Sequence, residues 1–249
     1  MTTHAAVRKA VDALVADSAV VESVYQPIVD LVSGTCIGFE ALARWPSIGP
    51  VDVDAVFVDA RSRGLLSHVE SACRTAALNG ALDAHLATDL TLFVNFEPDL
   101  GVQEWLSRGD NEATTRRVAS RLRMVVELTE SALLADPSAL MATVAWARAS
   151  GFGVALDDVG ANPQTLAMLP VVAPDVVKLD ASLVRSAQSP TGSRVMAAIN
   201  EYVRSSGAIM VAEGIETEDD RRRAVSLGAT LGQGWFYGKP GSLPCRTAP

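Results

Sequence analysis

Cysteine and histidine are scarce in this chain. Its 249 residues include three of each. The cysteines Cys36, Cys73 and Cys245 are widely spaced and form no C-x-x-C motif. We therefore expect neither a disulfide framework nor a zinc site, but small buried residues in a reducing compartment. The histidines lie far apart in the sequence, so no histidine metal site or nucleophilic triad is visible.

Basic residues and long apolar runs are also in short supply. The chain has 21 Lys and Arg against 29 Asp and Glu, a formal net charge of -8. This argues against a DNA or RNA duplex as partner, which would need a basic face. It leaves room for an anionic ligand, because bound divalent cations reverse the local field. No apolar run approaches the roughly 18 residues of a membrane span, and none follows the charged start as in a signal peptide. We expect a cytoplasmic protein without a membrane partner.

What the chain does contain is an alternation of short β-type runs with longer amphipathic stretches. This pattern is typical of a mostly parallel sheet with outer helices, and the length suits one α/β barrel. The predicted strands are 23–29, 36–44, 91–96, 124–128, 153–158, 176–180, 208–213 and 230–233. The predicted helices are 53–64, 67–87, 112–122, 137–150, 162–169, 191–205 and 218–227.

The first two predicted strands are joined only by a short turn around residues 33–35. Such a link makes a hairpin and not a right-handed crossover. The sequence therefore predicts a modified TIM-type (β/α)₈ barrel whose first strand is antiparallel to the others. We predict one domain over residues 20–241, with an N-terminal extension (1–19) and a C-terminal tail (242–249).

Acidic and amide side chains recur where the apolar runs stop. They are Glu40, Asn95, Glu127, Asp157, Asp158, Glu213 and, just behind it, Glu216. Hard oxygen ligands from many strands are what a Mg²⁺ or Mn²⁺ site requires. Adjacent Asp157 and Asp158 repel each other unless cations or hydrogen bonds intervene, and two metals about 3.5–4 Å apart could share one of them. An N-capping acid is the alternative for Asp158. The pattern predicts a metal-dependent barrel enzyme.

Two basic residues accompany the acids. Strand alternation places Glu40, Leu42 and Arg44 on one side of the sheet. Glu40 would then be a metal ligand and Arg44 a neighbouring residue that binds a phosphate; the alternative is an ordinary ion pair between them. Lys178 falls within an otherwise buried strand, where an ammonium group is costly without a partner. We expect Lys178 to point at carboxylates, water or a phosphate, with a structural salt bridge as the alternative.

These segments together resemble the EAL domain, the phosphodiesterase family acting on cyclic di-GMP. The matching pieces follow the family's order over roughly residues 20 to 240. They are Tyr25-Gln26-Pro27-Ile28-Val29, Glu40-Ala41-Leu42, Val94-Asn95, Glu127-Leu128-Thr129-Glu130, Asp157-Asp158, Lys178-Leu179-Asp180, Ala212-Glu213-Gly214-Ile215-Glu216-Thr217, Gln233-Gly234 and Lys239-Pro240.

The resemblance implies a role for each residue. One metal would be held by Glu40, Asn95, Glu127 and Asp157, and a second by the bridging Asp157 with Asp158 and Glu213. The catalytic residues would be Lys178 at the attacking water or a phosphate oxygen, Glu213 as a general base, and Glu130 bracing the loop after Asp158. The substrate would meet Gln26, Leu42, Arg44 and Gln233, with Glu216 in support.

The implied reaction is in-line attack of a metal-activated water on cyclic di-GMP, which gives linear pGpG. Two Mg²⁺ or Mn²⁺ ions per site would serve as cofactors, and a homodimer is the family's assembly. The chain departs from the family after Asp158, where residues 159–165 replace the usual Phe-Gly-Thr-Gly-Tyr-Ser-Ser loop and keep only its first Gly. The alternatives are a catalytically weak or inactive cyclic di-GMP receptor, or a different barrel enzyme such as a two-carboxylate glycosidase.

Overall fold

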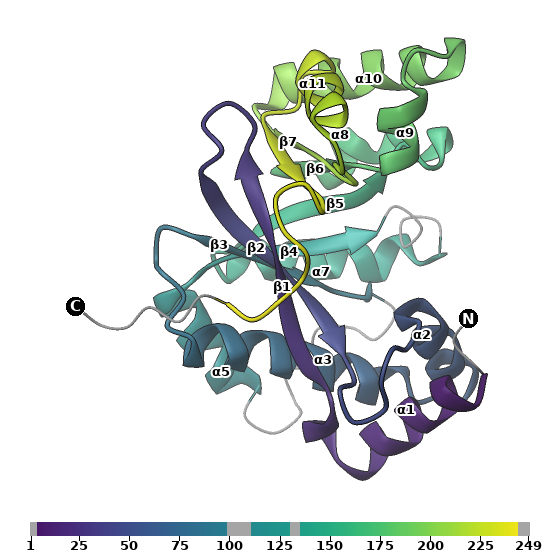
Figure 1. The fold of residues 1–249 in the computed structure, drawn as a ribbon, viewed down its shortest axis with the longest axis vertical. Coiled ribbons are helices and arrows are strands. Elements are labelled where there is room, and N and C mark those ends of the chain that lie inside the picture. Colours follow the sequence, from purple (N-terminus) through teal and green to yellow (C-terminus); the bar gives the residue numbers. More distant parts are fainter. Residues whose placement is uncertain (1–3, 99–110, 130–134, 244–249) are drawn as a thin grey trace.

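The barrel that the sequence predicts is present in the computed structural model, which describes residues 4–98, 111–129 and 135–243 (Figure 1). Within these residues, eight strands close into a ring in sequence order. They are β1 (Glu22–Asp30), β2 (Cys36–Arg44), β3 (Thr91–Asn95), β4 (Arg123–Thr129), β5 (Gly153–Val159), β6 (Val176–Leu179), β7 (Ile209–Ala212) and β8 (Leu231–Gln233). Neighbours from β2 to β8 are parallel, whereas β1 is antiparallel to both β2 and β8. The prediction of an antiparallel first strand is confirmed.

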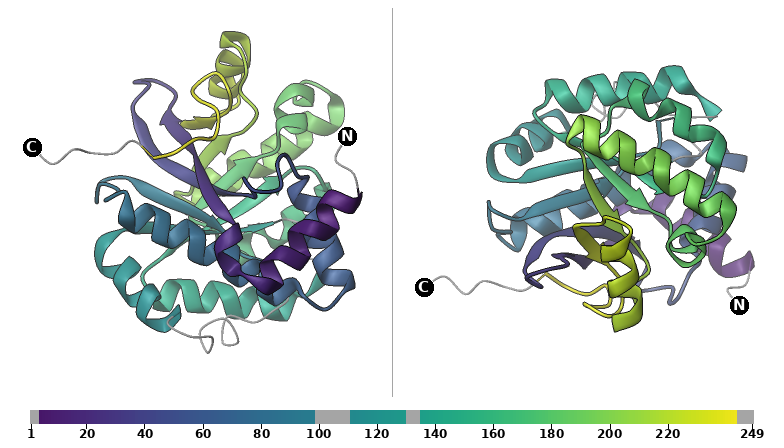
Figure 2. Two further views of the ribbon diagram at one scale, coloured as in Figure 1. Left: turned by 60° about the horizontal axis from the view of Figure 1, so that its bottom comes forward. Right: turned by 90° about the horizontal axis from the view of Figure 1, so that it is seen from above.

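Helices surround the strands, as the two views of Figure 2 show. They are α1 (His4–Ala16), α2 (Val53–Ser62), α3 (Leu66–Asp83), α5 (Asn111–Arg121), α7 (Pro137–Ala149), α8 (Leu169–Val172), α9 (Ala181–Ser186), α10 (Pro190–Ser206) and α11 (Glu218–Ser226), with 3₁₀ turns η1 (Ser18–Val20) and η3 (Pro163–Met168). No helix among the described residues is long and apolar enough to cross a membrane.

Three helical segments differ from the prediction. The helix expected over 162–169 is a 3₁₀ turn, η3, followed by the short α8. Helices α1 and α9 were not predicted. The apolar face of α1 packs against α2 and α3 in a core of its own, around Val11 and Val56. The domain boundaries at 19/20 and 241/242 stay a prediction.

Two apolar layers lie on opposite faces of the strands. The larger layer fills the space between strands and helices and includes Val126 and Leu128 of β4. The smaller layer fills the barrel interior and includes Phe93, Val125 and Val211. Because side chains alternate along a strand, each central strand sends one set of residues to the helices and the other to the interior. The interior residues are followed along the strands by polar residues.

Candidate active site

The polar residues of the site continue the interior apolar layer. On each contributing strand from β3 to β8, a polar residue follows an interior apolar residue by two positions. The pairs are Phe93 and Asn95, Val125 and Glu127, Ala155 and Asp157, Val176 and Lys178, Val211 and Glu213, and Leu231 and Gln233. Residues two apart share a face, so the polar side chains form a second layer toward the carboxyl ends of the strands, where TIM-type barrels place their active sites.

Lys178 is the centre of this layer. Its side chain is fully buried, and its Nζ lies 2.7 Å from Glu127 Oε1 and 2.7 Å from Glu213 Oε1. The same nitrogen lies 3.0 Å from Asp157 Oδ1 and 3.5 Å from Glu40 Oε2. Four carboxylates, from β2, β4, β5 and the segment after β7, therefore converge on one ammonium group, as expected for the buried lysine.

Amide side chains hold Glu40 from two sides. Asn95 Nδ2 donates to Glu40 Oε1 at 3.2 Å, and Gln233 Nε2 donates to Glu40 Oε2 at 2.5 Å. Gln233 Nε2 also reaches Gln26 Oε1 at 3.2 Å, and Gln26 Nε2 donates to Gly238 O at 3.1 Å. The antiparallel strand β1 thus contributes Gln26 to the same layer and ties it to the last strand.

A β-bulge places both members of the aspartate pair at the site. The β5–β6 register shifts between Leu156 and Val159, and Asp158 has φ of +57°, a strained left-handed value for a non-glycine residue. Asp158 therefore leaves the strand alternation, and a carboxylate oxygen of it lies within 4.8 Å of oxygens of Asp157 and Glu213. Its position inside β5 contradicts the alternative of a helix N-cap.

Burial and mutual repulsion raise the carboxyl pKa values. Burial raises the pKa of Glu127 well above its usual value, and Glu40 and Asp157 add to the shift although Lys178 opposes it. Burial likewise raises the pKa of Glu213 to about 8, against the effect of Lys178. Partial desolvation, together with the charge of Asp157, raises the pKa of the more exposed Asp158 to about 6.

The pKa of the ammonium group is raised as well, which favours its charged form. Burial acts to lower the pKa of Lys178, but Asp157, Glu127, Glu213 and Glu40 outweigh it and raise that pKa well above its usual value. Lys178 therefore carries its charge at neutral pH. Fully ionised, the four carboxylates and this ammonium group sum to -3, a negative charge that bound cations would balance.

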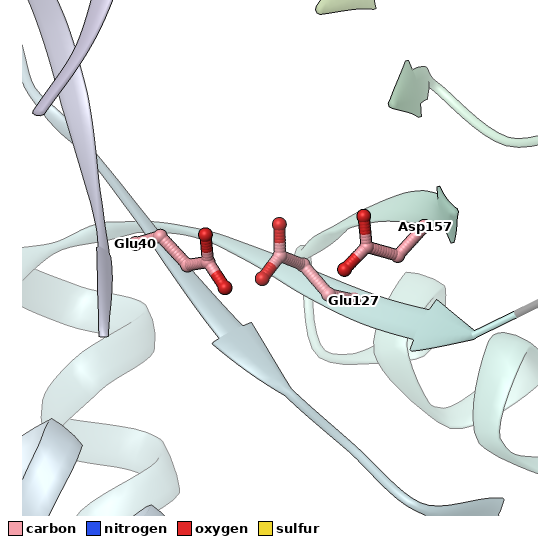
Figure 3. A group of neighbouring side chains, drawn as sticks. All are labelled: Glu40, Glu127 and Asp157. Carbon is pink, nitrogen blue, oxygen red and sulfur yellow. The ribbon is translucent and has the colours of Figure 1, made fainter. Parts of the chain in front are cut away.

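The donor set fits a divalent metal. Figure 3 shows the carboxylates of Glu40, Glu127 and Asp157 turned toward one another, with one oxygen of each within 4.8 Å of the others. Asp157, Asp158 and Glu213 form a second such group. Glu127 is fully buried, and among the described residues no hydrogen-bond donor reaches either of its carboxylate oxygens beyond the contact with Lys178. The two groups adjoin and share Asp157, and carboxylate oxygens are ligands that a divalent cation takes.

A cavity of about 550 Å³ opens beside this layer, and we call it the α2–α3 cavity. Its walls include Leu42 and Arg44, next to Glu40, Asn95, Asp157 and Asp158. Arg44 is half-buried, and its Nη1 donates to Ala43 O at 2.7 Å. Burial lowers the pKa of Arg44 despite the nearby charge of Glu40. Leu42 and Arg44 thus line an open space beside the carboxylate cluster.

This cavity is also lined by charged residues that the sequence does not mark as functional. They are Glu70 and Arg74 of α3, Arg61 of α2 and Glu97 after β3. Arg61 Nη2 lies 2.9 Å from Glu97 Oε2. Glu70 and Arg74 form an ion pair four residues apart along α3, and both are buried. Their i, i+4 spacing is visible in the sequence, but it is the usual spacing of solvated ion pairs on helices.

The remaining predicted residues are less connected. Glu216 lies exposed before α11, and its backbone N–H donates to Asp220 Oδ2 at 3.3 Å. Glu130 lies outside the described residues. The divergent loop forms the end of β5 and the start of η3. The individual roles of all site residues stay predictions.

Comparison with known proteins places the chain in a family. The EAL domain model matches residues 8–240. The chain belongs to the EAL family. Among curated relatives, the cyclic di-GMP phosphodiesterase RocR of Pseudomonas aeruginosa is 26% identical over 90% of this chain and 58% of its own length. The cyclic di-GMP phosphodiesterase PA2567 of the same species is 34% identical over 87% of this chain and 38% of its own length. The EAL chain described here thus spans well under two thirds of these relatives.

Solved EAL structures share the fold. The PaMucR phosphodiesterase in complex with c-di-GMP superposes with a TM-score of 0.76 at 24% identity, over 95% of this chain and 98% of that one. BlrP1 of Klebsiella pneumoniae, in a manganese and c-di-GMP complex at pH 6, gives a TM-score of 0.74 at 26% identity, over 89% of this chain and 56% of that one.

Proposed function

We propose that this EAL protein is a metal-dependent phosphodiesterase that hydrolyses cyclic di-GMP to linear pGpG. The observation that carries the proposal is the complete polar layer around Lys178, with four carboxylates within 3.5 Å of one ammonium nitrogen. The names of the relatives support the substrate, and the manganese complex of BlrP1 supports a divalent cofactor. We further propose that the protein acts in the cytoplasm and as a homodimer.

Two Mg²⁺ or Mn²⁺ ions are the proposed cofactors. Glu40, Asn95, Glu127 and Asp157 would hold one ion, and Asp157, Asp158 and Glu213 the other, in keeping with the two oxygen groups of the site. When bound, such ions lower the pKa of a water and neutralise charge on phosphate oxygens.

The protein side chains supply positioning, charge and proton transfer. Arg44, on the wall of the α2–α3 cavity, would pair with a substrate phosphate, because a guanidinium matches two phosphate oxygens. Lys178 would stabilise negative charge that develops on the phosphoryl oxygens. Glu213 would accept the proton of the attacking water, since its carboxylate lies beside Asp157 and Asp158 in the second group of oxygen donors.

The bonds balance with water as the only co-substrate. The water oxygen forms a bond to one phosphorus of the cyclic dinucleotide, and the bond from that phosphorus to a ribose oxygen breaks. The ribose oxygen leaves with a proton as a hydroxyl group, and one ring opening gives pGpG. Gln26 and Leu42 would hold the dinucleotide in the groove.

Product analysis tests the proposal directly. The purified protein is incubated with cyclic di-GMP with Mg²⁺, with Mn²⁺ and with a chelator, and the products are separated by chromatography. We expect pGpG only with a divalent metal. Turnover that persists in chelator would contradict the metal assignment and favour a two-carboxylate mechanism.

Ligand variants test the residues. We expect Glu40→Ala and Asp157→Ala each to lower turnover by more than about 100-fold, because loss of even an indirect metal contact costs 10–100-fold. The exposed Asp219→Ala on α11 serves as the control and should keep full activity. Near-normal turnover in Glu40→Ala or Asp157→Ala would show the metal assignment to be wrong.

A receptor is the second candidate function, and the divergent residues 159–165 favour it. In the family this loop positions the ligands of the second metal, so its change affects the half of the site that contains Asp158. A receptor would bind cyclic di-GMP tightly in calorimetry and release no pGpG. That outcome would replace the enzyme proposal.

A further inference from the structure

The buried ion pair on α3 lines the α2–α3 cavity and has no part in the proposed mechanism. Glu70 and Arg74 are each only 4% exposed, although the pair lies on a helix whose other buried residues are largely apolar. Burial raises the pKa of Glu70 to about 7 even with Arg74 beside it, so the local environment strongly opposes charge. A buried ion pair often contributes little net stability, which suggests that another function retains it.

Both members of the pair contact the segment that follows β3. Glu70 Oε1 accepts the backbone N–H of Glu97 at 3.1 Å. The Arg74 guanidinium carbon lies 4.5 Å from the centre of the Phe96 ring, within the range of a cation–π contact. Phe96 and Glu97 come directly after Asn95, the residue proposed as a metal ligand.

The β-ladder alone gives Asn95 limited support. Its pairing with β4 ends at the step Asn95 with Glu127, followed by one hydrogen bond from Phe96 N to Glu127 O at 2.9 Å. On the β2 side the pairing ends one residue earlier, at Ala41 with Val94. The backbone beyond Asn95 is therefore hydrogen-bonded to β4 on one side and to Glu70 on the other. The Phe96 ring also packs on Trp146 of α7, and the Glu97 side chain pairs with Arg61 of α2.

We propose that Glu70 and Arg74 form a positioning clamp for Asn95. The clamp fixes the two residues after Asn95 against α3, and thereby sets the direction of the Asn95 amide toward Glu40 and the metal position. The inference rests on the proposed function, because it assigns Asn95 as a metal ligand. Glu70 and Arg74 are positioning residues here, and neither touches the reacting atoms.

Two double variants distinguish a positioning role of the pair from the mere effect of burying charge. Removing Arg74 alone would leave Glu70 uncompensated, so both variants replace both residues. Glu70→Gln with Arg74→Met keeps an oxygen that can accept the Glu97 N–H. Glu70→Leu with Arg74→Met has a similar volume and lacks that acceptor. The exposed pair Glu201 and Arg204 on α10, changed to Leu and Met, is the control.

The readout is Mn²⁺ binding by calorimetry without nucleotide, together with the KM for cyclic di-GMP at saturating Mn²⁺. We expect the Glu70→Leu double variant to bind Mn²⁺ about tenfold more weakly than the Glu70→Gln double variant, in line with other indirect metal contacts. The control should match the wild type, and the KM for cyclic di-GMP should stay the same in all four proteins.

Other outcomes overturn the clamp. Equal Mn²⁺ affinity in the two double variants would contradict it. A raised KM for cyclic di-GMP at unchanged Mn²⁺ affinity would also contradict it, because the pair would then be a nucleotide contact. Wild-type protein that binds no Mn²⁺ would also contradict it. Wild-type protein that binds Mn²⁺ without turnover would contradict only the proposed function, since the difference between the double variants still tests the clamp.

A variant that keeps the charges guards against misfolding of the apolar one. Arg74→Lys retains the ion pair with Glu70 but lacks the planar group that stacks on Phe96. We expect a smaller but measurable loss of Mn²⁺ affinity, with an unfolding midpoint close to that of the wild type. Unchanged Mn²⁺ affinity in this variant would remove Arg74 from the clamp.

Discussion

At the scale of single residues, Lys178 supplies the positive charge that offsets the acidic cluster when no metal is bound. Its ammonium group lies within 3.5 Å of four carboxylates, and it is fully buried. It thus partly neutralises a group of acids that would otherwise repel one another. The structural salt bridge and the catalytic role, which the sequence left as alternatives, are compatible functions of the same side chain.

Replacing this lysine should make the folded protein dependent on metal. We expect Lys178→Met to lower the free energy of unfolding in chelator by about 3–5 kcal/mol, the usual cost of removing one partner of a buried ion pair. Added Mn²⁺ should recover more stability in Lys178→Met than in the wild type, since the cation compensates the same carboxylates. Urea unfolding with and without Mn²⁺ measures both effects.

The control for this prediction is a surface lysine. Lys239 is exposed and lies over the Trp235 ring at 4.7 Å. Its replacement by Met should change stability by less than about 1 kcal/mol, the range of exposed cation–π contacts. If Lys178→Met were no less stable than Lys239→Met in chelator, the charge balance inferred for the site would be incorrect.

The site was predictable residue by residue where it follows strand alternation. Glu127 and Glu213 end apolar runs, and the period of two turns them to the barrel interior beside Lys178. Alternation fails at Asp158, because this residue has a positive φ that no local sequence pattern predicts. The pair Glu70 and Arg74 was missed for another reason. Helix spacing brings two such residues together but does not say whether their face meets water or a cavity.

At the scale of elements, the contact between α3 and β1 depends on a missing side chain. Tyr25 of β1 donates its hydroxyl to Ala77 O of α3 at 2.9 Å. A Cβ at Gly80 would lie 2.3 Å from that hydroxyl oxygen but 3.4 Å from the next ring atom. A side chain at Gly80 would therefore overlap the tyrosine hydroxyl oxygen, whereas the ring would be at ordinary contact distance.

A double-mutant cycle follows from this geometry. Gly80→Ala alone should destabilise the protein by about 1–3 kcal/mol, because the methyl group overlaps the Tyr25 oxygen. In a Tyr25→Phe background the same change should stabilise by up to about 1 kcal/mol, since alanine favours the helix and the overlap is gone. Urea unfolding of the four proteins measures the cycle. An effect of the same sign in both backgrounds would contradict the close approach.

Every strand was predicted, whereas α1 and α9 were missed and the helix expected over 162–169 is a 3₁₀ turn followed by α8. The short link at residues 33–35 correctly gave the hairpin of β1 and β2. Helix α9 has only six residues and begins directly after β6, too short for a helical period to emerge. In α1 the buried Val7, Ala10, Val11 and Leu14 do recur at helical spacing, but the segment precedes the first strand of the barrel, and the sequence indicates only an N-terminal extension.

At the scale of the whole molecule, the metal ligands proposed for the site join distant parts of the barrel. They come from β2, β3, β4, β5 and the segment after β7. A cation bound by all of them would favour the closed barrel over the unfolded chain, because unfolding separates the ligands.

Thermal unfolding should therefore respond to metal. With Mn²⁺ at about 100 times its dissociation constant, we expect a gain of about 2.7 kcal/mol and a rise in the unfolding midpoint of about 5–10 °C. A chelator should reverse the rise, and Asp157→Ala should abolish it because both metal positions share that residue. Differential scanning calorimetry measures the midpoint. An equal rise in Asp157→Ala would place the metal elsewhere.

The antiparallel first strand has a consequence for the synthesis of the chain. Its partner β8 supplies Gln233, which lies 207 residues after Gln26 and 193 after Glu40. At about 5–20 residues per second, translation from Gln26 to Gln233 takes about 10–40 s. During that time the hairpin of β1 and β2 has one unpaired edge, and such edges invite pairing with other chains. The edge of β1 that β8 finally covers is thus the one that a growing chain leaves open longest.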